Sequence, residues 1–129
     1  MRILVCDDNA DAAETLRVLL ASDGHEVIAL SDSRACLEKA LEWVPEVAFL
    51  DVGMPGLTGY ALARQIRARF GRRILLVAVT GYGSQEDKTV AFEVGFDMHL
   101  VKPVQPAKLL SIAANRQGTG QAALASPGR

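Results

Sequence analysis

Acidic, hydroxyl and ammonium side chains follow directly on several short apolar stretches of this sequence. They are Asp7 and Asp8 after residues 2–6, Asp51 after residues 47–50, Thr80 after residues 74–79 and Lys102 after residues 98–101. If the apolar stretches are parallel strands of one sheet, their carboxyl ends meet at one edge, where open α/β sheets bind ligands. The spacing therefore predicts that these five side chains converge on a single site.

Such a cluster has a specific chemistry. Three carboxylates close together raise one another's pKa, and a bound divalent cation removes that conflict. An all-oxygen, partly hydrated site suits Mg²⁺. One carboxylate could then act as a nucleophile while the metal and Lys102 neutralise an incoming phosphoryl group and Thr80 donates a hydrogen bond to it. A single Asp after a strand is usually a helix cap, and we interpret Asp11 in that way, but five such groups favour a site.

The elements that must position these residues alternate along the chain. The expected strands cover residues 2–6, 26–30, 47–50, 74–79 and 98–101, and their apolar composition indicates that both faces of the sheet are covered. The expected helices open at Asp11 with Glu14, at Ser31 or Ser33, at Thr58, at Ser84 with Asp87 and at Pro106, and the first four end at Gly24, before Pro45, at Gly71 and at Gly95.

This alternation predicts an α/β fold with a central parallel sheet and helices on both faces. Five strand–helix units are too few for an eight-stranded barrel, so we expect an open, doubly wound, five-stranded parallel sheet. From residue 115 onward the periodicity is lost and small and polar residues dominate. We therefore expect one domain over residues 1–115 and a mobile C-terminal tail over residues 116–129.

Composition narrows the function further. With 129 residues and a formal net charge of −1, the chain predicts one domain without the positive charge that nucleic-acid binding requires. No apolar run approaches the ~20 residues that cross a bilayer, and the first residues do not resemble a signal peptide. Cys6 and Cys36 are interpreted as reduced, buried thiols. We expect a cytoplasmic domain with no membrane contact.

Four segments carry a resemblance to a known family: VCDDN, FLDVGMPGLTGY, AVTGYG and HLVKPV. They resemble the motifs of CheY-like receiver domains of two-component response regulators, in the same order, from residue 1 to about residue 115. The resemblance implies a flavodoxin-like (βα)₅ fold with strand order 2-1-3-4-5. It also implies a phosphoacceptor that takes a phosphoryl group from the phosphohistidine of a sensor histidine kinase or a histidine phosphotransfer protein. Such a domain is not a conventional enzyme, although it assists its own Mg²⁺-dependent phosphorylation and dephosphorylation.

The same resemblance assigns roles to individual residues. It marks Asp51 as the phosphoacceptor. The Mg²⁺ ligands would be the carboxylates of Asp8 and Asp51 and the backbone carbonyl of Gly53, with Asp7 acting through water. It marks Thr80 as the switch hydroxyl and Lys102 as the lysine that pairs with the phosphoryl group.

One position departs from the family pattern. The switch residue three positions before the lysine is aromatic in the family, whereas here it is His99. A histidine can fill that pocket, so we keep His99 with Thr80 as a switch residue. A catalytic or metal-binding role for His99 is the alternative, but no second His or Cys lies near it in sequence, which favours a half-buried strand histidine.

Two finer features follow from the last motifs. The chain must turn sharply after residues 98–101 while Lys102 points back to Asp51, so we expect a cis Lys102–Pro103 bond, as the resemblance also implies. Gly53 and Tyr82 lie two residues beyond Asp51 and Thr80, at positions that the family marks as tuning hydrolysis. Gly53 cannot orient a water and Tyr82 can shield the site, which predicts a comparatively long-lived phosphoryl group.

Other functions remain open at this stage. A Mg²⁺-dependent aspartyl phosphohydrolase would need a second Asp two residues after the nucleophile, where Gly53 stands. A flavin-binding domain would need a hydroxyl-rich loop in place of Asp7 and Asp8. A receiver-like interaction module that is never phosphorylated would have lost an acidic or lysine position, and none is lost. The chain could be a stand-alone regulator or, as we slightly favour, the receiver of a hybrid sensor kinase.

A basic stretch stands apart from this site. It consists of Arg64, Arg67, Arg69, Arg72 and Arg73. Without interleaved aromatic residues or an overall positive charge, it is interpreted as a solvated helix face rather than a binding surface.

Overall fold

The computed structural model describes residues 1–125 except Pro55, Tyr82 and Ser84; residues 126–129 also lie outside the description. The strands are β1 (Arg2–Cys6), β2 (Glu26–Leu30), β3 (Val47–Asp51), β4 (Leu75–Thr80) and β5 (Met98–Val101). The helices are α1 (Ala10–Ser22), α2 (Ser33–Trp43), α3 (Gly59–Phe70), the short 3₁₀ helix η1 (Gly71–Arg73), α4 (Gln85–Val94) and α5 (Pro106–Ala125).

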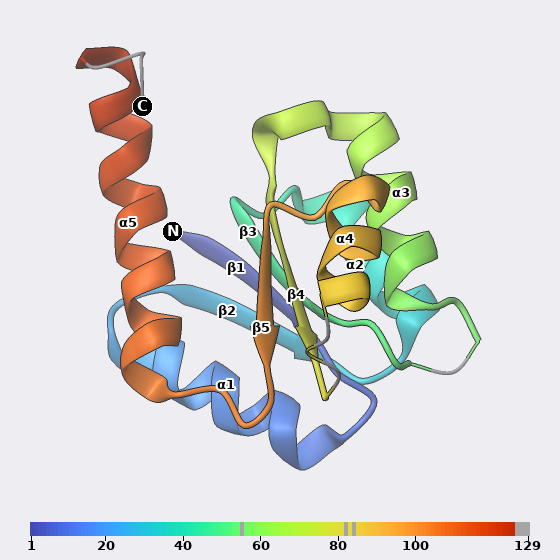
Figure 1. Ribbon diagram of the computed structural model, residues 1–129. Helices are drawn as coiled ribbons and strands as arrows, with labels where there is room; N and C mark the ends of the chain where they lie inside the picture. Colours follow the sequence, from blue (N-terminus) through green and yellow to red (C-terminus); the bar gives the residue numbers. More distant parts are fainter. Residues whose placement is uncertain (55, 82, 84, 126–129) are drawn as a thin grey trace.

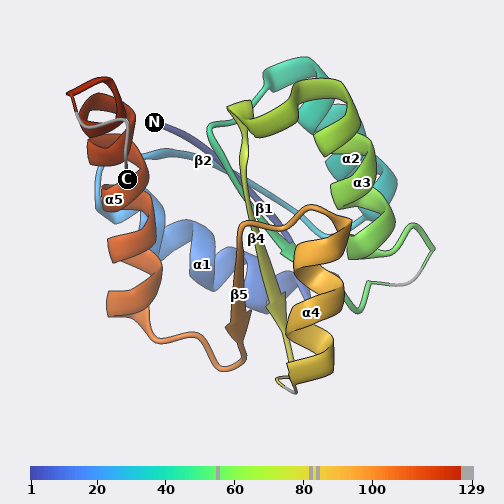
Figure 2. The same cartoon turned by 45° about the horizontal axis from the view of Figure 1, so that its top comes forward.

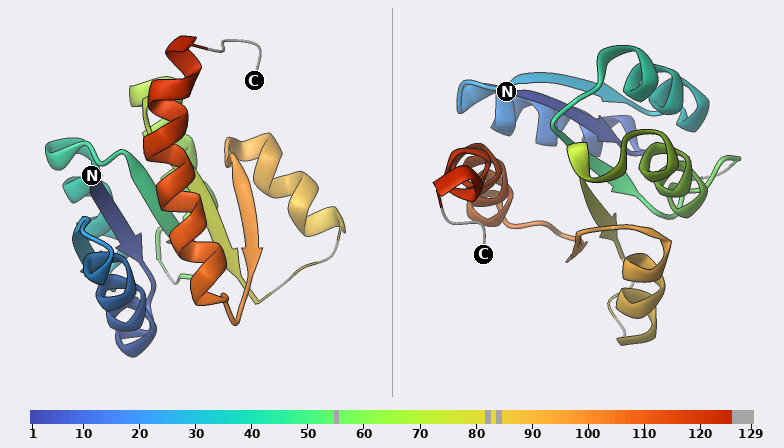
Figure 3. Two further views of the ribbon diagram at one scale, coloured as in Figure 1. Left: turned by 90° about the vertical axis from the view of Figure 1, so that its left-hand side faces the viewer. Right: turned by 90° about the horizontal axis from the view of Figure 1, so that it is seen from above.

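All five strands are parallel and form one sheet in the order β2-β1-β3-β4-β5, which confirms the predicted fold (Figure 1). Helices α1 and α5 cover one face, and α2, α3 and α4 cover the other, as the view from above shows (Figure 3). β3 is the central strand and is buried along its whole length. Every carboxyl end of a strand therefore points to the same edge of the sheet, with Asp51 and Thr80 as the last residues of β3 and β4.

The strand residues alternate between two hydrophobic cores. One core lies under α2, α3 and α4, where Leu4, Leu50 and Leu76 are fully buried. The other lies under α1 and α5 and includes Phe49, among the largest of the fully buried side chains. This alternation fixes the register of each strand, because a slip by one residue would move every side chain to the opposite face.

Two of the helix starts differ from those expected. Asn9, not Asp11, is the N-cap of α1, and its side chain accepts a hydrogen bond from the Ala12 N–H, so α1 begins before Asp11. Asp32, which lies between the two expected serines, caps α2. The predicted cap of α3, Thr58, is confirmed. Asp and Asn are at least as good caps as Ser, so sequence alone could not choose between neighbouring candidates.

The last helix is longer than the periodicity suggested. α5 continues to Ala125, so the backbone is helical over most of the segment expected to form a tail, and only residues 126–129 lie outside the described part. Helical backbone needs no apolar stripe when Ala and Gln, both good helix formers, occupy many of the positions. The division of the chain at residue 115 stays a prediction. Among the residues described, no helix is long and apolar enough to span a bilayer.

Candidate functional site

Asp7 and Asp8 lie where β1 leaves the sheet. The backbone N–H of Asp7 still donates to the carbonyl of Leu30 in β2, so the strand holds Asp7 in place. Its side chain is buried, and its Oδ1 accepts a hydrogen bond of 3.0 Å from the N–H of Asn9, the cap of α1. Asp8, one residue on, points away from the core and is exposed to solvent. The pair thus offers one anchored and one accessible carboxylate.

Asp51 is the last residue of the central strand. Its backbone pairs with Val79 of β4, and the whole residue is only 7% exposed to solvent. Its Oδ1 accepts a hydrogen bond of 3.0 Å from the backbone N–H of Gly53, in the loop that follows. The strand end and the loop together fix this carboxylate so that its second oxygen faces the site.

Lys102 reaches that second oxygen from β5. Its Nζ lies 3.0 Å from Oδ2 of Asp7 and 3.4 Å from Oδ2 of Asp51, so one ammonium group contacts two carboxylates. Its backbone N–H donates to the carbonyl of Thr80 at 2.8 Å, and the Lys102–Pro103 bond is cis, as predicted. Burial lowers the pKa of Lys102, but the contacts with Asp7 and Asp51 outweigh burial and raise it overall.

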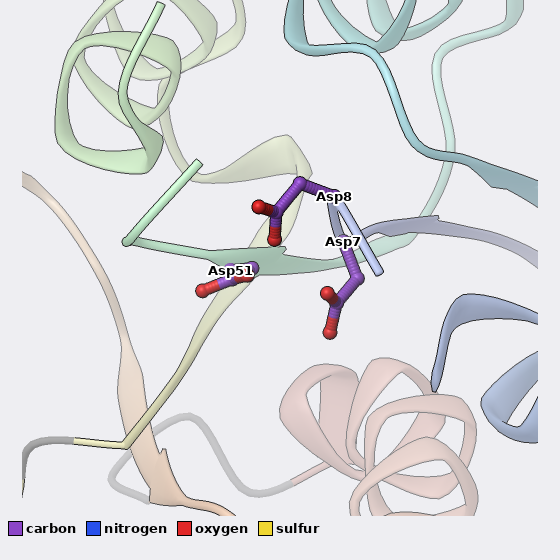
Figure 4. Close-up of side chains that lie close together, drawn as sticks. All are labelled: Asp7, Asp8 and Asp51. Carbon is purple, nitrogen blue, oxygen red and sulfur yellow. The ribbon is translucent and has the colours of Figure 1, made fainter. Parts of the chain in front are cut away.

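The three carboxylates come together at this edge (Figure 4). One oxygen from each of Asp7, Asp8 and Asp51 lies within 4.8 Å of the other two, and no other group of three His, Cys, Asp or Glu in the described part of the chain meets that condition. Burial raises the pKa of Asp51, and the neighbouring Asp8 and Asp7 raise it further, against the lowering effects of Gly53 and Lys102. One lysine does not balance three acids, so the donor set fits a hard divalent cation such as Mg²⁺.

Thr80 and His99 lie on the neighbouring strands. Thr80 ends β4 and is buried, beside Val101 of β5. His99 is half-buried in β5, and both of its ring nitrogens are shielded from solvent without a hydrogen-bond partner among the described residues. Burial lowers the pKa of His99, as does the charge of Lys88, while Asp87 raises it. The switch residue His99 is not part of the carboxylate cluster, and Tyr82, one of the two predicted tuning positions with Gly53, lies outside the described residues.

Gly59 is a site-positioning residue that sequence reasoning missed. A Cβ at this position would lie 2.5 Å from the carbonyl oxygen of Asp51 and 2.5 Å from Cα of Val52. The first turn of α3 therefore packs directly on the backbone at the end of β3, which only glycine permits. The signal was present, because Gly59 follows the Thr58 cap, but nothing in one sequence distinguishes a close approach from an ordinary helix start.

With this geometry established, comparison with known proteins gives the family. The sequence profile of the response regulator receiver domain matches residues 3–114. The chain belongs to this family. Receiver domains of two-component systems accept phosphoryl groups from histidine kinases and bind Mg²⁺ through acidic residues, and the described part of this chain brings three acidic residues together at one edge of the sheet.

Curated relatives of the receiver domain include regulators of transcription. The transcriptional regulatory protein AruR of Pseudomonas aeruginosa is 32% identical over 119 residues, which cover 88% of this chain and 48% of AruR. An uncharacterised 14.6 kDa protein of Leptolyngbya boryana is also 32% identical, over 87% of this chain and 86% of its own length. The chain spans about half the length of most of the curated relatives compared.

Solved structures agree with the receiver fold. A CheY-like receiver domain protein from Methanospirillum hungatei superposes with a TM-score of 0.84 at 25% identity, covering 94% of this chain and 97% of the other. The chemotaxis protein CheY4 of Vibrio cholerae gives a TM-score of 0.82 at 29% identity, covering 88% and 96%. The predicted fold class and family are thereby confirmed.

Proposed function

We propose that Asp51 is the phosphoacceptor of this receiver domain. The observation that carries the proposal is its position at the end of the central strand, with Oδ1 fixed by Gly53 and Oδ2 facing Lys102. Asp7 is more deeply buried, and Asp8 contacts no ammonium group in the described part of the chain. Asp7 shares the fixed orientation and the lysine contact, so what favours Asp51 is its place at the end of the central strand and its lesser burial, 7% exposed against 2% for Asp7.

The residues that would hold Mg²⁺ are Asp8, Asp51 and the backbone carbonyl of Gly53, with Asp7 acting through a water molecule. A Cβ at residue 53 would stand 3.6 Å from Oδ1 of Asp51, an ordinary van der Waals contact, so this backbone lies next to the carboxylate and still has room for a side chain. When bound, the metal supplies positive charge that neutralises the carboxylates and the phosphoryl oxygens. Asp8 is accessible to solvent, which suits a direct metal ligand, whereas the buried Asp7 would reach the metal through a water molecule.

The reaction is transfer from the phosphohistidine of a sensor histidine kinase or a histidine phosphotransfer protein. An oxygen of Asp51 attacks the phosphorus, the P–N bond to the donor histidine breaks, and the imidazole leaves with the bonding electron pair. The product is an acyl phosphate on Asp51. Lys102 stabilises the charge on the transferring group, and its salt bridge to Asp7 keeps its ammonium at the site when the Asp51 oxygen becomes esterified.

Thr80 is the residue that we propose senses the modification. Its hydroxyl ends β4 next to the site, from where it can donate a hydrogen bond to a phosphoryl oxygen. His99, on the adjacent strand, would follow by filling the space beside Thr80, so that the α4–β5 region changes when Asp51 is phosphorylated. Autodephosphorylation would proceed by attack of water in line with the P–O bond. The partner that reads the switched state is a protein contacted by this surface.

The experiment is phosphorylation with a small acyl or amido phosphate in the presence of Mg²⁺, followed by intact-mass spectrometry. The wild type should gain one phosphoryl group, and Asp51→Asn should gain none. Asp8→Ala, or removal of Mg²⁺ with a chelator, should suppress the reaction. Asp11→Asn, which removes an exposed carboxylate of α1 outside the cluster, should react like the wild type. Equal uptake by Asp51→Asn and the wild type would overturn the assignment.

A further inference from the structure

The five arginines of the basic stretch do not share one role. Arg67 donates to the carbonyls of Gly95 and Ile74 and pairs with Asp97, which Arg72 also contacts. The guanidinium of Arg73 lies over the ring of Phe70. Arg64 and Arg69 remain exposed on α3, and neither has an ion pair or hydrogen bond with another described residue. Three of these arginines therefore make contacts within the fold, whereas Arg64 and Arg69 carry charges that no described residue pairs.

Arg69 lines a groove between α2 and α3, which lie side by side on one face of the sheet (Figure 2). The groove consists of two hollows of about 390 Å³ each that share Leu37 and Gln65. The first hollow is completed by Arg34, Gly56 and Leu57, and the second by Leu41, Ala68 and Arg69. Each hollow is thus lined by one arginine and two leucines.

The shape of the groove matches a helix. One side of α2 carries Arg34, Leu37 and Leu41. The first and the last are seven positions apart, which is about 10 Å, or two helical turns. Leu41 is 38% exposed, so part of its apolar side chain is accessible to a ligand in the groove. A groove of this length, with leucines on its walls, accepts the apolar face of an amphipathic helix through residues at i, i+3 or i+4, and i+7.

The charges define the partner's chemistry. Arg34 also lacks an ion pair or hydrogen bond with any other residue that the structure describes, and no carboxylate lines either hollow there. An occupying helix with acidic residues flanking its apolar face would pair with both guanidinium groups. Nucleic acid fits less well, because it would leave the leucines against phosphate and offers affinity only through several phosphate contacts.

We propose that the α2–α3 groove is a docking site for an acidic amphipathic helix of a partner protein. The groove begins at Gly56 and Leu57, in the β3–α3 loop that follows Asp51 and supplies the Gly53 carbonyl. A Cβ at Gly56 would stand 3.7 Å from Oγ of Ser33 in α2, so this loop also packs on the first turn of the other wall. The docking site therefore shares one loop with the carboxylate cluster, although none of the three carboxylates lines it, and it does not depend on phosphorylation of Asp51.

The probe is a synthetic amphipathic peptide of about 14 residues, twice the two turns of the groove, lactam-bridged to hold it helical. Leucines occupy i, i+3 and i+7 of its apolar face, and glutamates flank them; a control peptide carries lysines instead. NMR titration of the ¹⁵N-labelled protein should give saturable shifts confined to α2, α3 and the β3–α3 loop. Binding should weaken by about tenfold or more in Arg34→Glu/Arg69→Glu and stay unchanged in Arg64→Glu, which alters an arginine outside the groove.

Three results would overturn the proposal. One is the absence of saturable shifts up to about 1 mM peptide, or shifts centred on another face. The second is binding of a mixed-sequence DNA duplex by the wild type that is lost in the double variant. The third is self-association without peptide, detected by sedimentation and abolished in the double variant, because the groove would then bind a second copy. The NMR spectrum of each variant verifies its fold.

Discussion

The two ends of the sheet hold their carboxylates in opposite ways. At the amino ends of β4 and β5, Asp97 accepts from Arg67, Arg72 and the N–H of Leu76, so one acid meets two guanidinium groups and a backbone donor. At the carboxyl ends, three acids lie together, and the ammonium of Lys102 contacts two of them, Asp7 and Asp51. The Asp97 carboxylate is thus fully paired by the chain's own groups, whereas the cluster at the carboxyl ends has an excess of negative charge.

The Asp97 cluster is a structural one, whereas the cluster of Asp7, Asp8 and Asp51 is the candidate functional site. A carboxylate whose partners all come from the same chain lowers the free energy of the fold and is lost only at a cost. An uncompensated cluster weakens the fold until an external cation compensates its negative charge. Removing a charged group should therefore have opposite effects on stability at the two ends, and the following variants test that contrast.

Arg67→Ala should have the largest effect on stability. It removes the cation that joins Asp97 to the carbonyls of Gly95 and Ile74, and both side chains of the ion pair are mostly buried. Breaking such a pair costs about 3–5 kcal/mol, so the free energy of unfolding in urea should fall by that order. Arg64→Ala, which removes an exposed arginine of the same helix, should change it by no more than about 0.5 kcal/mol. A loss below about 1 kcal/mol for Arg67→Ala would contradict the view that the Asp97 cluster stabilises the fold.

Mg²⁺ should stabilise the folded chain through the carboxylate cluster. At ten times the dissociation constant, a ligand that binds only the native state adds about 1.4 kcal/mol. Thermal unfolding should show this increase for the wild type and for Asp11→Ala, and little of it for Asp8→Ala. An unchanged Mg²⁺ effect in Asp8→Ala would place the cation elsewhere.

Asp51→Asn should make the metal-free protein more stable at neutral pH. Burial and the neighbouring acids raise the pKa of Asp51 in the folded state, so the folded chain holds this proton more tightly than the unfolded chain. Stability is therefore fully present below the ordinary pKa of an aspartate and is lost as pH rises through the raised value. The variant should gain about 1 kcal/mol at pH 7, the scale of one close like-charge contact.

Unfolding measured across acidic to neutral pH tests this sign. The difference between Asp51→Asn and the wild type should shrink to zero as pH falls below the ordinary aspartate pKa. Asp11→Asn, at an exposed position, should show no comparable pH-dependent gain. A variant that is less stable than the wild type at pH 7 would contradict the view that this cluster is frustrated without a cation.

Gly53→Asn should have the smallest effect, on the lifetime of the phosphorylated form. Glycine offers no side chain to orient a water molecule behind the phosphorus, whereas an amide does, so dephosphorylation should quicken by a few-fold, about 1 kcal/mol in the barrier. Decay of the phosphoprotein measured by intact mass gives the two rates. Equal or slower decay in the variant would show that residue 53 does not limit access of water.

The sequence predicted the carboxylate cluster at the carboxyl ends of the strands better than the Asp97 cluster at the amino ends of β4 and β5. Asp7, Asp51 and Lys102 were found because each follows an apolar stretch, and parallel strands align their carboxyl ends. The Arg67–Asp97 ion pair was not predicted, because it joins residues 30 positions apart through helix packing that no local sequence pattern encodes. Gly59 and the extension of α5 to Ala125 were missed for related reasons: the first depends on a close backbone approach, and the second on helical propensity without an apolar period.

The most direct test of the central claim is to locate the phosphoryl group chemically. After reaction of the wild type with a small phosphoryl donor and Mg²⁺, borohydride reduces an acyl phosphate, and so converts the acceptor aspartate to homoserine. Peptide mapping by mass spectrometry should then find homoserine at residue 51 and unmodified aspartate at residues 7, 8 and 97. Homoserine at residue 7 or 8, or no conversion at residue 51, would contradict the account.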